Sequence, residues 1–170
     1  MSVTYASPSP CNAGKAAIIA AAEKFARDAE LQPGDPLEAI VERLGGRVCY
    51  KPLDDADLDD GSIVVEGQGQ FTITLPTYTG AARDRFTIAH ELGHYFLHYP
   101  RCCAPMAAKR YGSDRVEWEA NWFAAGLLMP SAQFRDAYAT YAGDVAKLAA
   151  LFGVSQQAAT IRAKGLGLLL

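Results

Sequence analysis

The side chains best suited to chemistry in this sequence are its three histidines, His90, His94 and His98, which fall within one nine-residue stretch. The first two bracket a glutamate in the order His-Glu-x-x-His. On an α-helix, residues four apart lie one turn above each other, so His90 and His94 can reach the same ion. Glu91 then points to the neighbouring edge of that face, where a water activated by the ion would sit. The spacing therefore predicts the metal site of a zinc hydrolase with Glu91 as its general base.

The residues around this motif have the pattern of an amphipathic helix. One broad side of the helical wheel is apolar or small and comprises Phe86, Ile88, Ala89, Leu92, Gly93, Phe96 and Leu97. A polar arc of roughly 100° comprises Thr87, His90, Glu91, His94 and His98. We therefore expect the apolar side to be buried in the core and the polar side to face a cleft.

A catalytic zinc usually has three protein ligands, so a third ligand is required. His98 is a poor candidate, because it lies about 12 Å of helical rise from His90, and a straight helix cannot bring three successive turns onto one ion. His98 is expected either to contact the site from behind or to be an ordinary solvated histidine.

The segment 116–129 offers the missing ligand. It is apolar nearly all round, and its only polar residues are Glu117, Glu119 and Asn121. A carboxylate carried into a core needs a compensating partner such as a metal. Glu117 shares a flank with Asn121 and Glu119 lies on the opposite flank, which favours Glu117 modestly. The alternative is that both glutamates reach solvent at the start of the helix and stabilise its dipole.

Two motifs resemble those of a known family. The first is Arg85-Phe86-Thr87-Ile88-Ala89-His90-Glu91-Leu92-Gly93-His94, and the second is Glu117-x-x-Ala120-Asn121-x-Phe123-Ala124-Ala125-x-Leu127-Leu128-Met129-Pro130. Together they resemble the ImmA/IrrE family of zinc metallopeptidases. A looser likeness at 152–155 and 166–168 extends the resemblance over most of residues 35–170.

This resemblance implies a zincin-like fold and a gluzincin-like site in which Glu117 completes the ligand set of His90 and His94. It also implies cleavage of a helix-turn-helix transcriptional repressor as part of a stress, prophage or mobile-element response. The expected mechanism is attack of a metal-activated water on a peptide bond. Zinc suits two imidazoles and one carboxylate, although manganese or iron would also accept them. His98, Asn121, Tyr111 and Tyr78 are candidates for supporting the ligands or the oxyanion.

The fold class expected from these elements is α+β. Helices are predicted at 13–31 and 36–44, a strand at 47–50, and a hairpin of 62–65 with 70–75 around the turn 66–69. The hairpin would either hold substrate as an added strand or merely cover the core. The predicted organisation is a flexible tail at 1–12, a metallopeptidase core at 13–130, and a C-terminal helical segment at 131–170 packed on that core.

The C-terminal segment raises a rival function. Residues 144–151, the turn 152–155 and a helix 156–164 resemble a helix-turn-helix pair. If this pair bound DNA, its second helix would place Gln156, Gln157, Thr160 and Arg162 in the major groove. Basic residues are few there, and the net charge of −3 gives no basic field, so packing or partner docking is favoured over DNA binding. The rival function is a non-catalytic DNA- or repressor-binding regulator with a structural or sensing metal site.

The cysteines and the apolar runs indicate a cytoplasmic protein. The four cysteines, Cys11, Cys49, Cys102 and Cys103, lack the paired spacing of a structural zinc site, so reduced thiols are expected. The adjacent Cys102 and Cys103 leave a redox or sensing role open. Residues 16–22 are interpreted as an amphipathic helix, not a signal peptide, and no stretch reaches the roughly 18–20 apolar residues of a membrane span.

Overall fold

The computed structural model describes residues 4–52, 62–77, 79–102, 104–109 and 114–170. Its helices are α1 (Lys15–Asp28), α2 (Glu38–Arg43), α3 (Ala81–Gly93), α4 (Arg115–Leu128), α5 (Ser131–Thr140), α6 (Val145–Phe152) and α7 (Gln156–Gly165). Its strands are β1 (Gly46–Lys51), β2 (Ser62–Gly67), β3 (Gln70–Pro76) and β4 (Met106–Lys109). The predicted helices at 13–31 and 36–44 are thus present but shorter. The α+β fold class is confirmed.

The four strands form one mixed sheet in the order β1-β3-β2-β4. β1 runs parallel to β3, with Val48 opposite Ile73, whereas β2 runs antiparallel to both β3 and β4. The predicted hairpin is therefore confirmed, with Gly69 in the turn at a φ of +72° that a residue with a side chain rarely adopts. On β3 the side chains of Phe71, Ile73 and Leu75 are buried.

The N-terminal segment follows the edge of this sheet. Ala6 pairs with Met106 in a parallel bridge, with hydrogen bonds of 2.7 Å from Ala6 N to Pro105 O and 3.1 Å from Ala107 N to Ala6 O. Further along, the backbone N–H groups of Cys11 and Asn12 donate to the carboxylate of Glu119. The prediction of a flexible tail over residues 1–12 did not anticipate these contacts of residues 6–12. Backbone groups bind partners about a hundred residues away here, and no side-chain pattern in the segment signals that.

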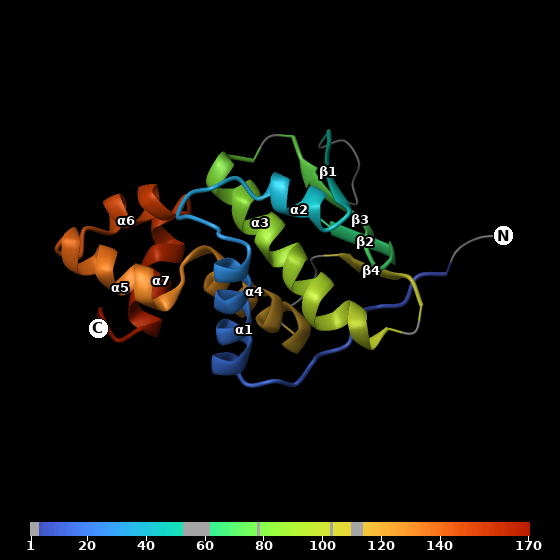
Figure 1. Cartoon of the computed structure of the whole chain (residues 1–170), viewed down its shortest axis with the longest axis horizontal. Helices are drawn as coiled ribbons and strands as arrows, with labels where there is room; N and C mark the ends of the chain where they lie inside the picture. The colour runs from blue at the N-terminus through green and yellow to red at the C-terminus, as the bar shows by residue number, and fades with distance from the viewer. Residues whose placement is uncertain (1–3, 53–61, 78, 103, 110–113) are drawn as a thin grey trace.

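Three helices form the layer that carries His90 and His94, with α4 packed between α1 and α3 (Figure 1). α3 and α4 approach closely at Gly93, where an added Cβ would lie 3.0 Å from the Cα of Ala120. On the other side of α4, a Cβ on Gly126 would lie 2.8 Å from the carbonyl oxygen of Ile19 on α1. Both glycines are therefore required for close helix packing.

The polar arc of α3 is more buried than the sequence predicts. Thr87, His90, Glu91, His94 and His98 are all buried, whereas Phe86, Phe96 and Leu97 of the apolar side are only half-buried. The prediction that the polar side faces a cleft did not anticipate that these side chains would be buried. The polar groups of α4 face this arc and satisfy its histidines, so the arc is buried without leaving them unpaired.

The C-terminal helices α5, α6 and α7 follow α4 directly (Figure 1). α6 ends at Gly153, whose φ of +61° is the left-handed conformation typical of a helix C-cap, and α7 begins with Ser155 as its cap. Arg162 of α7 is buried and donates to the carbonyl oxygen of Met129 and to Glu23 of α1. The assignment of Arg162 to a DNA-reading face is therefore wrong, because its guanidinium fixes α7 to the core.

None of the helices in the described ranges combines the length and the apolar character needed to cross a membrane.

We predict that Gly93→Val separates α3 from α4, because the larger side chain meets the backbone of Ala120 and Cβ of Phe123. Overpacking of this kind costs about 1–3 kcal/mol, which urea unfolding would measure. Gly80→Ala is the matched control, since a Cβ there has nothing within 4 Å. Equal stability of the two variants would show that the close approach at Gly93 does not constrain the helix pair.

Candidate metal centre

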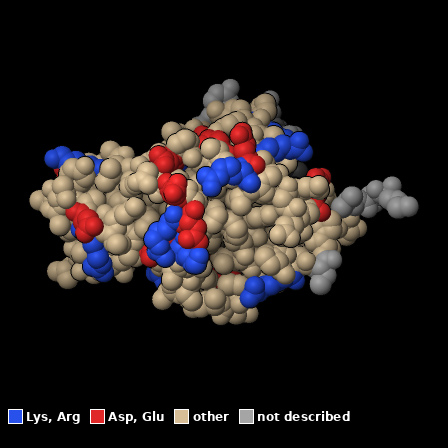
Figure 2. Space-filling view, in the orientation of Figure 1, with Lys and Arg blue, Asp and Glu red and all other residues tan. Residues whose placement is uncertain are grey.

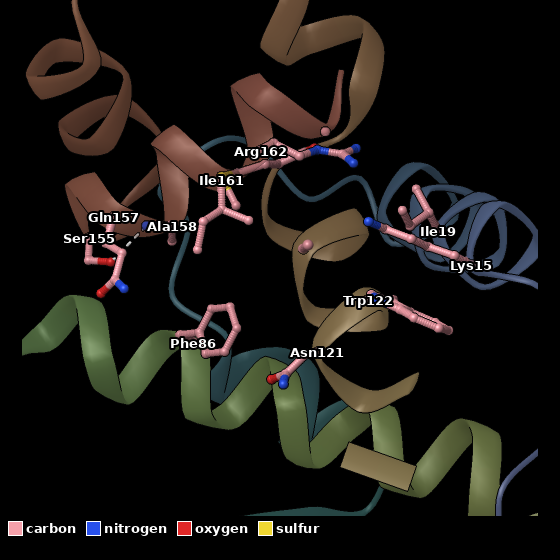
Figure 3. Close-up of a pocket in the computed structure, with 13 residues that line it drawn as sticks. Lys15, Ile19, Phe86, Asn121, Trp122, Ser155, Gln157, Ala158, Ile161 and Arg162 are labelled. Atoms are coloured by element: carbon pink, nitrogen blue, oxygen red, sulfur yellow. Dashed lines mark hydrogen bonds between the residues drawn. The ribbon is translucent and has the colours of Figure 1, made fainter. Parts of the chain in front are cut away.

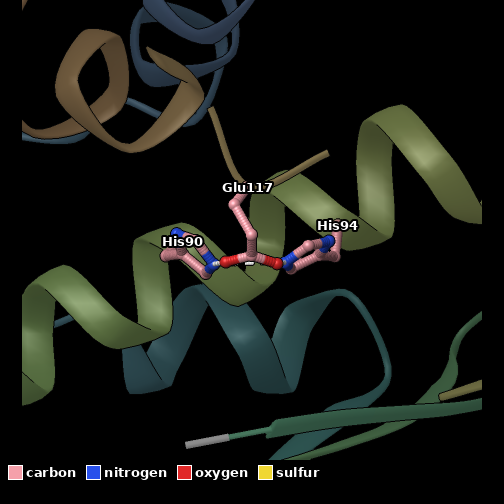
Figure 4. A group of neighbouring side chains, drawn as sticks. All are labelled: His90, His94 and Glu117. Atoms are coloured by element: carbon pink, nitrogen blue, oxygen red, sulfur yellow. Dashed lines mark hydrogen bonds and ion pairs between the residues drawn. The ribbon is translucent and has the colours of Figure 1, made fainter. Parts of the chain in front are cut away.

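Three buried side chains from two helices converge on one point (Figure 4). His90 and His94 of α3 and its continuation bring their Nε2 atoms to 3.1 Å from each other. The two carboxylate oxygens of Glu117 lie 3.1 Å from His90 Nε2 and 3.3 Å from His94 Nε2. One ligand atom from each residue falls within 4.8 Å of the others, and all three residues are buried. The predicted set is therefore brought together by the fold.

The start of α4 places Glu117. Asp114 is the N-cap, and its carboxylate accepts from the backbone N–H of Glu117 at 3.1 Å. Glu117 consequently lies in the first turn, and its side chain points across to α3. Only 6% of Glu117 and 0% of Glu119 is exposed. The alternative in which both glutamates reach solvent is therefore wrong.

A hydrogen bond from His90 to Asn121 selects the tautomer of His90. The carbonyl oxygen Oδ1 of Asn121 lies 2.9 Å from His90 Nδ1 and can only accept, so the ring proton is on Nδ1. The Nε2 of a neutral His90 is then bare, and its lone pair points at the carboxylate of Glu117. Asn121 thus has the supporting role that the sequence suggests.

The charges of the three groups call for a cation between them. Burial lowers the pKa of His94, which keeps this imidazole neutral near pH 7. Burial alone would raise the pKa of Glu117, but the adjacent imidazoles of His90 and His94 hold it at about 2, so the carboxylate is ionised. Two nitrogen lone pairs and an anionic oxygen in a buried space repel one another unless a proton or a metal ion joins them. The donor set fits a divalent metal.

His98 contacts the site from behind. It follows His94 in a π-helical turn, His94–His98, which widens the end of α3. Its Nδ1 lies 3.0 Å from Nδ1 of His94, and its Nε2 lies 3.0 Å from a carboxylate oxygen of Glu119. Burial, followed by the neighbouring His94, lowers the pKa of His98 to about 4, so the ring is neutral at pH 7. The alternative of a solvated His98 is therefore wrong.

Of the other candidate residues, the structure describes Glu91 and Cys102. Glu91 is buried on α3, next to His90 in the chain. Tyr78, Tyr111 and Cys103 lie outside the described residues, so their predicted roles remain predictions. Cys102 is half-buried, and its Sγ lies 3.5 Å from the carbonyl oxygen of His98.

The groups that bind Glu119 were not predicted from the sequence. Arg115 Nε donates to Glu119 Oε1 at 2.8 Å. This contact is an i,i+4 pair of opposite charges, a spacing visible in the sequence. The two backbone N–H groups of Cys11 and Asn12 carry no such signal.

A cavity of about 570 Å³ lies behind Asn121, between the core and α7 (Figure 3). Phe86 of α3, Trp122 of α4 and Ile161 of α7 contribute to its lining, together with Lys15 and Ser155. Asn121 lines the cavity and also accepts from the side of His90 opposite to the converging Nε2 atoms. The cavity therefore lies beyond Asn121, on the side of His90 that faces away from Glu117.

Comparison with known proteins places the chain in a family. A comparison with curated proteins found no match. The family model described as the IrrE N-terminal-like domain, Peptidase_M78, matches residues 41–164. The matched range contains α3, α4 and all three converging side chains, and it covers well over half of the 170 residues. The chain therefore belongs to the family of IrrE N-terminal-like domains, Peptidase_M78, whose members have a metallopeptidase-type function.

Proposed function

We propose that this protein is a zinc-dependent endopeptidase that cleaves one peptide bond in a specific protein substrate, a helix-turn-helix transcriptional repressor. The observation that supports the proposal most strongly is the convergence of His90, His94 and Glu117 beside Glu91. A structural metal site would close all positions around the ion with protein ligands, whereas three ligands leave a fourth position for water or substrate. A structural site would also have no need of a general base.

His90, His94 and Glu117 would hold the ion through two imidazole nitrogens and a carboxylate. Zinc bound there would supply Lewis acidity, which lowers the pKa of water and polarises the scissile carbonyl group. Manganese and iron would also accept these ligands, and metal analysis of the purified protein distinguishes the three.

Glu91 supplies the proton transfers. As a carboxylate it takes a proton from the attacking water while the oxygen of that water forms a bond to the scissile carbonyl carbon. The same carboxyl group then gives the proton to the amide nitrogen as the carbon–nitrogen bond breaks. The products are a carboxylic acid and an amine, and transfer of the acid proton to the amine gives a carboxylate and an ammonium group. Tyr78 and Tyr111 remain candidates for stabilising the oxyanion.

The choice of a repressor as substrate rests on the family and on charge. Acidic and basic side chains are interspersed on the face shown in Figure 2, and the net charge of −3 does not favour nucleic acid as a partner. A helix-turn-helix repressor cleaved by this protein would release the genes that it silences. Stress, prophage and mobile-element responses are the settings that the family resemblance implies, and in such a response the protein would share the cytoplasm with its substrate.

We predict that the purified protein binds about one zinc ion per chain after reconstitution, and that His90→Ala, His94→Ala and Glu117→Gln bind it far more weakly. The two histidine variants each remove a nitrogen ligand, and Glu117→Gln replaces an anionic oxygen ligand by a weaker neutral one. Elemental analysis and competition with a chromophoric chelator measure the two quantities. Glu42→Gln makes the same chemical change as Glu117→Gln on the exposed side of α2 and should bind zinc normally. Normal binding by His90→Ala and His94→Ala would rule out this centre.

A second prediction concerns the general base. Glu91→Gln keeps the size of the side chain and leaves the three ligands in place, but an amide cannot accept the proton of water. Zinc content should persist while cleavage of the repressor encoded beside this gene falls by orders of magnitude. A time course with wild type, Glu91→Gln, Glu42→Gln and chelator-treated wild type makes the comparison.

Equal cleavage by all four samples would point to a contaminating protease. Binding of the repressor by zinc-loaded wild type without cleavage would favour the non-catalytic regulator instead.

A further inference from the structure

We infer that the N-terminal strap, residues 4–12, orients the candidate ligand His94 through Glu119 and His98, and so sets the metal affinity of the centre. The inference rests on the proposed function, because it concerns the same three-ligand site. It assigns positioning roles to His98, Glu119 and the strap, none of which would contact the ion.

The first link joins His98 to the candidate ligand. His94 Nδ1 and His98 Nδ1 are 3.0 Å apart, and both residues are at most 1% exposed. Water therefore does not compete for this hydrogen bond. The ring centroids lie 5.0 Å apart with a tilt of 52°, an arrangement made by the widened π-helical turn between the two residues.

The proton positions along the chain follow from Glu119. Its carboxylate can only accept, so the Nε2 of His98, 3.0 Å away, carries a proton. The Nδ1 of a neutral His98 is then bare and accepts from His94 Nδ1, which must carry the proton of that ring. His94 is thereby left with a bare Nε2 pointing at Glu117. The order Glu119, His98, His94 thus selects the tautomer that a metal requires.

The strap holds Glu119 at the far end of this chain. The backbone N–H groups of Cys11 and Asn12 donate to Glu119 Oε2 and Oε1 at 2.7 and 2.8 Å. Asn12 has a φ of +59°, and such a left-handed residue lets successive N–H groups point at one anion. The guanidinium of Arg115 donates to Glu119 at 2.8 Å and also to the carbonyl oxygen of Ala13. Glu119 therefore receives four charge-assisted hydrogen bonds, two of them from the strap.

A packing role alone does not explain these residues. An apolar ring at position 98 would fill the space without the desolvation cost of a buried imidazole. Arg115 alone could neutralise Glu119. The imidazole of His98 adds a connection to a ligand, with every buried nitrogen paired. His90 receives the equivalent support from Asn121 on α4, so the two imidazoles are oriented by separate elements.

The test compares zinc affinity with the stability of the metal-free protein in four variants. His98→Phe keeps a ring and removes both nitrogens, and we expect zinc binding to weaken by about 10- to 100-fold. Tyr95→Phe is its control on the same π-helical turn, because it removes only the hydrogen bond from Gly69 N, at 3.0 Å. Tyr95→Phe should lower the stability of the metal-free protein and leave zinc affinity unchanged.

Two variants test the strap. Asn12→Pro removes one N–H group and forbids the positive φ. Zinc affinity should therefore also fall, by a smaller factor than in His98→Phe. Asn12→Gly keeps the N–H group and favours positive φ, so its zinc affinity should match wild type. Chelator competition gives the zinc affinity, and urea unfolding of metal-free protein gives the stability.

Wild-type zinc affinity in His98→Phe would overturn the inference, even if its stability fell, because packing alone would then explain the residue. Wild-type zinc affinity in Asn12→Pro would show that the strap does not influence the metal affinity of the centre. Failure of the wild type itself to bind zinc would instead contradict the proposed function.

Discussion

The structure depends on the burial of ionisable side chains of α3 and α4 against one another. Two imidazoles and one carboxylate of the centre meet at 3.1–3.3 Å in a buried space. Such an arrangement is costly unless a cation joins the groups. The contact of Gly93 with Ala120 brings the helices close enough for it, and Asp114 starts α4 where Glu117 reaches the histidines. The candidate metal centre therefore depends on the close packing of α3 against α4.

Each imidazole is supported by a different part of the chain. Asn121, one turn beyond Glu117 on α4, orients His90. His94 is oriented by His98, which is bound to Glu119, and Glu119 is bound to the N-terminal segment and to Arg115. The candidate metal centre thus depends on residues from position 11 to position 121, because metal ligands need fixed tautomers as well as fixed positions.

The centre itself could be predicted from the sequence because its signals are local. The spacing of His90 and His94 follows from the helical period, and an apolar helix that carries few carboxylates indicates a partner for them. The hairpin was predictable for the same reason, since Phe71, Ile73 and Leu75 alternate with threonines. The third candidate ligand, Glu117, was favoured by its flank on α4 and by the family resemblance.

What could not be predicted depends on tertiary contacts. The burial of the polar arc of α3 depends on α4 covering it, and the burial of Arg162 depends on Glu23 and Met129 being nearby. The attachment of residues 6–12 uses backbone groups, which are the same in every sequence. Such features arise from packing between distant segments and leave no periodic pattern.

X-ray absorption at the zinc edge of the reconstituted wild-type protein tests the central claim most directly, because it reports the ligand atoms themselves. The expected spectrum has a nitrogen and oxygen shell of about four ligands at about 2.0–2.1 Å, with multiple-scattering features of two imidazoles. Sulfur ligands at about 2.3 Å, or a shell without imidazole, would contradict it.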